Sequence, residues 1–119
     1  MFFNDFVIKK IIRDPGFQSG SLQGYVNENY FNLVEVFGEP THGESGDSKV
    51  FTEWDLSFVV QEEGEADTET VYATIYDWKE AGPMTAREAT KYNWHIGGKS
   101  KKSVEVVEQA IADHFGRKA

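Results

Sequence analysis

A glycine-rich turn before the last amphipathic stretch has the residue types nearest to those of a phosphate-binding loop. It consists of Gly97, Gly98, Lys99, Ser100 and Lys101. A Walker loop needs a glycine five residues before its Gly-Lys-Ser triplet, because successive backbone N–H groups wrap the phosphates; that position is Asn93. We therefore do not expect nucleotide hydrolysis. Two interpretations stay open: an anion site at a helix N-terminus, or a tight turn followed by solvated lysines.

Paired carboxylates in the middle of the chain are the second candidate for chemistry. Residues 28–80 hold fourteen acids against two bases. Asp77 lies across a predicted hairpin from Glu53 and Asp55, and carboxylates so placed can share a proton or bind a cation. Asp77 also fits a hydrogen-bonded turn, or a cross-strand partner for a lysine. Both interpretations stay open.

The loop of that hairpin is acidic as well, with Glu62, Glu63 and Glu65. It lacks the ligand spacing and glycine position of an EF-hand loop, so it is typical of a solvated tip rather than a calcium site. Together with Glu53 and Asp55, the loop predicts a negatively charged face. Such a face steers association with a basic partner.

The histidines form no recognisable catalytic or metal-binding pattern. His114 falls near the end of a predicted helix, where the helix dipole alone favours it. His95 alternates with Trp94 and Ile96, so we expect it to face water or a groove; as a general base it would need a partner that the sequence does not identify. No Ser-His-Asp order with a nucleophile elbow is present. We favour a protein without enzymatic activity, metal or cofactor.

Composition narrows the class of protein further. The 119 residues fit one domain spanning 1–119, and nine Phe, five Tyr and three Trp supply enough apolar area for a core. The absence of cysteine excludes disulfides, thiolate zinc sites and thiol nucleophiles. The chain lacks a basic, apolar leader and an apolar run of membrane-spanning length, so we expect a cytoplasmic protein. A net charge of −8 argues against direct contact with nucleic acid or anionic membranes.

Hydrophobic periodicity predicts an α+β domain: a small antiparallel sheet of about four strands, in the order β-β-α-β-β-α, with helices packed on one face. The predicted strands are residues 6–12, 21–26, 49–60 and 70–79, with a brief one at 94–96; the predicted helices are 30–37, a short turn through 85–91, and 103–115. Residues 70–79 carry apolar bulk on both faces. That strand is therefore central in the sheet, or one of its faces is a contact surface.

Several short phrases occur together in the chain. They are GYV at 24–26, YFNLVEVFGEP at 30–40, Lys49, EW at 53–54 with Phe58, ATIYDWK at 73–79 and WHIGGK at 94–99. Their order and spacing resemble those of small, uncharacterised proteins encoded by bacteriophages, over about residues 21–112. Residues 1–20, an N-terminal strand and turn, fall outside the resemblance. What it implies is a phage product made in the cytoplasm of a bacterial host; it implies no activity and no residue roles.

These observations favour a phage accessory protein that binds a host protein with a basic surface, as an inhibitor of a host defence or nucleic-acid enzyme. The predicted contact residues are Glu53, Asp55, Glu62, Glu63, Glu65, Tyr76, Trp78 and Trp94. The aromatic members, with Trp54, form either core or an exposed patch. The alternatives are a small-ligand or nucleotide binder using residues 97–101, and a virion or assembly component. The oligomeric state stays open.

Overall fold

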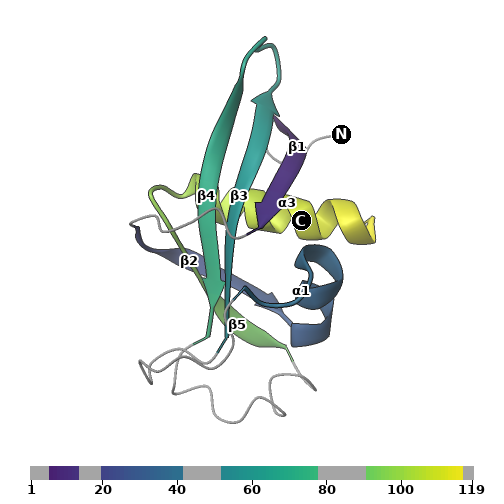
Figure 1. Ribbon diagram of the computed structural model, residues 1–119, viewed down its shortest axis with the longest axis vertical. Coiled ribbons are helices and arrows are strands. Elements are labelled where there is room, and N and C mark those ends of the chain that lie inside the picture. The colour runs from purple at the N-terminus through teal and green to yellow at the C-terminus, as the bar shows by residue number, and fades with distance from the viewer. Residues whose placement is uncertain (1–5, 14–19, 42–51, 78–90, 117–119) are drawn as a thin grey trace.

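The computed structural model describes residues 6–13, 20–41, 52–77 and 91–116 as one antiparallel sheet with two helices. The strands are β1 (Phe6–Arg13), β2 (Ser21–Glu28), β3 (Glu53–Glu62), β4 (Thr68–Tyr76) and β5 (Tyr92–Gly98), and the helices are α1 (Tyr30–Phe37) and α3 (Lys102–Phe115). The sheet order is β1-β3-β4-β5-β2 (Figure 1). The α+β class and the antiparallel sheet are therefore confirmed.

Helix α1 forms where its apolar spacing predicts. Leu33 and Phe37 are buried on one face, and the side chain of Asn29 accepts a hydrogen bond from the backbone N–H of Asn32 at 2.8 Å. This N-cap satisfies a donor that the first helical turn leaves without an intrahelical partner. The helix ends at Gly38, whose φ of 83° suits glycine.

The core lies between the sheet and the two helices, because alternate strand residues point to that side. The buried apolar residues of its strands include Phe6 of β1, Trp54, Leu56, Phe58 and Val60 of β3, Ala73 and Ile75 of β4, and Trp94 and Ile96 of β5. Phe37 of α1 meets the ring of Phe58, with centroids 6.1 Å apart. Ser103 of α3 donates a hydrogen bond to the carbonyl of Tyr72 on β4. Both helices thus pack against the same face.

The number of strands corrects the sequence-based prediction. Residues 94–96 are part of a seven-residue strand, β5, which pairs with both β4 and β2, so the sheet has five strands rather than about four. In β5, Trp94 and Ile96 point to the side of the sheet that the helices cover, while Asn93 and His95 point to the other side. Because two of its seven residues are glycines at its end and two are polar, the alternation of apolar and polar residues in β5 is weak in the sequence. Residues 85–90 of the helical turn expected at 85–91 lie outside the described residues, and Lys91 is not helical.

Candidate functional site

Strand alternation places a polar, aromatic set of side chains on the sheet face opposite α1 and α3, called here the outer face. Because Trp54 and Ile75 point to the core, their neighbours Glu53 and Tyr76 point outward. Glu53 pairs with Tyr76 in the ladder between β3 and β4, and Asp55 pairs with Thr74. Thr74 pairs in turn with Gly97 of β5. The register thus brings residues from three strands side by side.

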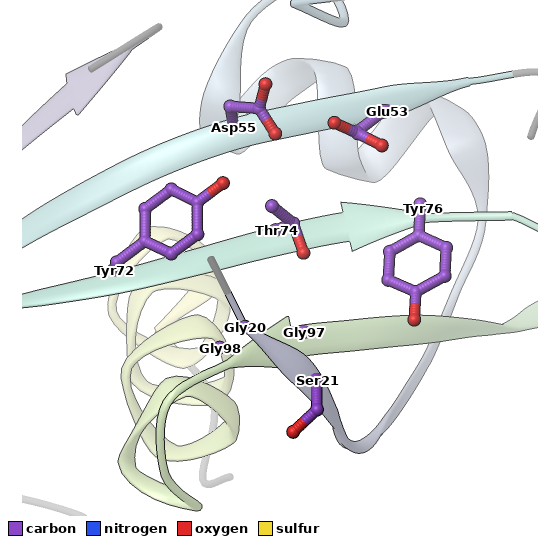
Figure 2. A pocket seen from close by; sticks show the side chains of 9 residues that line it. All are labelled: Gly20, Ser21, Glu53, Asp55, Tyr72, Thr74, Tyr76, Gly97 and Gly98. Atoms are coloured by element: carbon purple, nitrogen blue, oxygen red, sulfur yellow. The ribbon is translucent and has the colours of Figure 1, made fainter. Parts of the chain in front are cut away.

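These residues surround a hollow of about 190 Å³. Its lining is Gly20, Ser21, Glu53, Asp55, Tyr72, Thr74, Tyr76, Gly97 and Gly98. Figure 2 shows the ring of Tyr72 leaning toward Asp55 on β3, whereas the ring of Tyr76 extends over β5. Since the two rings point in opposite directions, they leave an opening over Thr74.

The hollow depends on the missing side chain of Gly97. A Cβ atom at this position would lie 2.5 Å from Oγ1 of Thr74 and 3.4 Å from Cε1 of Tyr76. The first of these separations is too short for a stable contact, so a larger residue would push into the space between the tyrosines. Glycine in a strand interior often marks the close approach of another group.

The electrostatics of the hollow are those of a cation acceptor. Burial, followed by the charges of Asp55 and Glu53 and a hydrogen bond to Asp55, raises the pKa of Tyr72 to about 12. Burial, followed by the charge of Glu53, also raises the pKa of Tyr76. Both phenols therefore stay protonated at neutral pH. Among the described residues that line the hollow, two are acidic and none is basic.

An aromatic row continues the outer face beyond the hollow. The ring of His95 stacks on Tyr76 with centroids 5.2 Å apart, and Tyr25 of β2 meets His95 edge-on at 5.0 Å. Tyr25 is 51% exposed. The prediction that His95 faces away from its apolar neighbours is consistent with this position. Together, the row Tyr25, His95 and Tyr76 and the hollow form a continuous acidic and aromatic surface.

The structure brings three of the predicted contact residues together and separates three others. Glu53, Asp55 and Tyr76 line the hollow. Glu62 instead forms an ion pair with Lys102 of α3, on the helix side of the sheet, while Glu63 and Glu65 are exposed at the hairpin tip. The acidic surface is therefore divided between the hollow and the tip. Trp78 lies outside the described residues.

Trp94 was wrongly predicted to be a contact residue. Its side chain is 0% exposed, it packs against Trp54 with centroids 5.5 Å apart, and its Nε1–H donates to the carbonyl of Glu28. A buried indole with its donor satisfied is a core residue. Of the aromatic cluster, Trp54 and Trp94 are core, whereas Tyr76 lies on the outer face.

Of the remaining residues that line the hollow, only some could be assigned to this face from the sequence pattern. Alternation along 70–79 places Tyr72 and Thr74 on the same face as Tyr76. The contributions of Ser21 and Gly97 depend on which strands pair, and in what register. Strand order is not encoded in the period of a single strand, so these residues could not be assigned to one site in advance.

Asp77 has a structural role that fits the hydrogen-bonded-turn interpretation. It is 0% exposed, and its Oδ1 accepts from the backbone N–H of Thr52 at 3.0 Å. The backbone N–H of Asp77 donates back to the carbonyl of Thr52. Asp77 does not line the hollow with Glu53 and Asp55, so the carboxylate pair lies along β3 rather than across the hairpin.

The glycine-rich turn is built differently from a phosphate loop. Gly97 and Gly98 belong to β5 and pair with Leu22 and Ser21 of β2, and the carbonyl of Gly98 accepts from Gln23. Lys99 and Ser100 form a bend, and Lys101 precedes α3. The two glycines therefore serve the sheet. Anion binding by the remaining turn residues stays a prediction.

Within the described parts of the chain, no group of three or more His, Asp and Glu side chains is placed to hold a metal ion. In the same ranges, no helix has both the length and the apolar character needed to cross a membrane. Comparisons with protein-family models, curated proteins and solved structures give no match to this chain.

Proposed function

We propose that this chain is a non-enzymatic phage accessory protein that binds a basic surface of a host protein through the hollow and the aromatic row. The observation that carries the proposal is a hollow with two carboxylates in its wall and a tyrosine at each end (Figure 2). Concave sites with a few convergent polar groups are the usual places for ligands and for side chains of partners. The phage context rests on the sequence resemblance alone.

The charge of the partner follows from the charge of the surface. The chain carries a net charge of −8, and fourteen of its twenty acids lie in residues 28–80, which include β3 and β4. A field of one sign attracts partners of the opposite sign and accelerates their association. Anions are repelled by the same field, so a basic protein surface is the best-matched partner.

Inhibition is the simplest consequence of such binding. Enzymes that act on nucleic acids hold the phosphate backbone with lysine and arginine side chains. An acidic domain seated on those side chains excludes the nucleic acid without any chemistry of its own. We therefore propose that the host partner is a nucleic-acid or defence enzyme whose basic surface is blocked.

A pull-down from bacterial lysate with matched charge variants tests this function. Glu53→Gln removes one charge from the hollow, and Glu63→Gln removes one charge from the exposed hairpin tip as a control. We expect one host protein to be retained at low salt by the wild type and by Glu63→Gln, released by high salt, and lost with Glu53→Gln.

The retained protein is then purified, and its activity is assayed with each variant. Inhibition by the wild type and by Glu63→Gln, but not by Glu53→Gln, supports the proposal. Retention that is indifferent to both salt and Glu53→Gln contradicts it. A retained nucleotide with no protein partner also contradicts it and favours residues 97–101 as the site.

A further inference from the structure

The hollow has the size of a site for a single side chain. Its volume of about 190 Å³ is below the roughly 300–1,000 Å³ of pockets that hold drug-sized ligands. A whole nucleotide or a folded segment of a partner is too large for it. One extended side chain that enters over Thr74, between Tyr72 and Tyr76, fits the opening seen in Figure 2.

The groups around the opening are predominantly acceptors. Asp55 is 8% exposed and receives the hydrogen bond of Tyr72, while Glu53, two residues along the same strand, is partly exposed. Ser21 and Thr74 add hydroxyl oxygens that can accept. An occupant that only donates hydrogen bonds, and carries positive charge, matches this lining.

Arginine meets these conditions better than lysine. Its guanidinium presents five donors in a planar fork, engages a carboxylate through two parallel hydrogen bonds, and lies flat on aromatic rings. The lysine ammonium is a compact and strongly hydrated charge without a flat face. A flat cation near two phenol rings gains a cation–π contribution when it lies within roughly 6 Å of a ring centroid.

We propose that the hollow receives the guanidinium of an arginine side chain from the partner protein, with Glu53 as its bidentate acceptor and Tyr76 as its stacking platform. This inference rests on the proposed function and specifies the chemical group that the site recognises. A second copy of this chain, facing the hollow with its own outer face, would bring like carboxylates together, so a foreign basic protein is the occupant.

The test measures how small probes bind the intact, ¹⁵N-labelled protein by NMR. The probes are N-acetyl-L-arginine amide, N-acetyl-L-lysine amide and N-acetyl-L-citrulline amide. Citrulline keeps the shape of arginine but lacks its charge. We expect saturable shifts at the amides of Thr74, Tyr76 and Gly97 with the arginine probe, several-fold weaker binding of the lysine probe, and no saturation with citrulline.

Two variants locate the binding in the hollow. Glu53→Gln keeps the shape of the side chain and should weaken the arginine probe roughly tenfold, as expected for loss of a charge-assisted pair. Gly97→Ala should block the hollow, because its Cβ enters the space beside Thr74 and Tyr76. If Gly97→Ala fails to fold, the loss of arginine binding by Glu53→Gln alone tests the location of the site. The control Glu63→Gln should bind like the wild type.

The outcomes separate this inference from the proposed function. Equal binding of arginine and lysine probes, or saturable binding of citrulline, overturns the assignment of a guanidinium site. If a host protein is nevertheless retained in a Glu53-dependent manner, the proposed function stands without it. If neither the arginine probe nor a host protein binds, both are overturned.

Discussion

At the scale of single residues, the pKa of the Tyr72 phenol depends on the negative charge inside the hollow. Burial of its ring, and then the charges of Asp55 and Glu53, raise the pKa of Tyr72 from 10.0 to about 12. A protonated phenol can donate to Asp55, and this hydrogen bond keeps that carboxylate in the wall of the hollow. The same hydrogen bond connects the orientation of the tyrosine ring to the acid that attracts a cation.

Replacing Asp55 by asparagine should lower the pKa of Tyr72 part of the way toward 10.0, because the charge is removed while burial remains. The folded state favours the protonated phenol, so its contribution to stability is complete below about pH 10 and is lost as pH rises toward about 12. A ¹³C-tyrosine NMR titration, assigned with Tyr72→Phe, measures the change. An identical titration curve in Asp55→Asn would contradict the role given to this carboxylate.

At the scale of elements, the approach of α3 to β5 depends on the absence of a side chain at Gly98. A Cβ atom there would lie 1.9 Å from Oγ and 2.7 Å from Cβ of Ser103. Ser103 is fixed by its hydrogen bond to the carbonyl of Tyr72 at 2.6 Å, so it cannot yield without breaking the contact between α3 and β4.

Gly98→Ala should therefore destabilise the fold by about 1–3 kcal/mol, the usual range for overpacking. Urea unfolding measures the loss. The matched control is Gly24→Ala in β2, where the added Cβ would meet only the end of the Val104 side chain, at 3.0 Å. We expect the control to lose less stability. Equal losses would show that generic strand effects, and not the contact with Ser103, set the cost.

The local elements were predictable from the chain because each has its own period. The stripe of α1 and the alternation of β3 needed only short-range information. The prediction that residues 70–79 are central, or present a contact face, is confirmed in its first form, since β4 lies between β3 and β5. Strand β5 was underestimated because its polar and glycine positions weaken the alternation.

The candidate site was predictable only in fragments. The outward direction of Glu53 and Asp55 follows from the alternation of β3, and both do line the hollow. The sequence left open whether Trp94 belongs to the core or to an exposed aromatic patch, and in β5 it occupies a core-facing position. The hollow itself arises from the register that sets Thr74 opposite Gly97. This pairing joins residues far apart in the chain, and neither composition nor hydrophobic periodicity predicts it.

At the scale of the whole molecule, the sheet edges are poorly suited to bind another strand. The strand order leaves β1 and β2 at the edges. The register of β1 shifts between Ile8 and Lys10, and that of β2 shifts between Leu22 and Gly24. Shifts of this kind twist an edge and discourage pairing with a foreign strand, as do lysines placed there. This arrangement favours the outer face, rather than an edge, as the surface for the proposed partner.

The net charge of −8 acts on the whole molecule and should give salt two opposite effects. Raising NaCl from roughly 10 mM to roughly 1 M shortens the Debye length from roughly 30 Å to roughly 3 Å. The molecule measures 44 × 30 × 21 Å, so repulsion across it is felt at low salt and screened at high salt. We expect the unfolding midpoint to rise with salt while binding to the basic partner weakens.

The opposite signs make the measurement decisive, because a loss of binding at high salt cannot then be caused by unfolding. Thermal unfolding and partner retention are measured across the same salt series. Among the described residues, an opposing contribution to stability comes from the ion pairs of Lys102 with Glu62 and Glu69, which salt weakens. Partly exposed pairs of this kind are worth about 0–1 kcal/mol, and we expect the relief of repulsion in this acidic chain to outweigh them. An unfolding midpoint that falls with salt would show that the ion pairs between α3 and the β3–β4 hairpin affect stability more than the repulsion caused by the net charge.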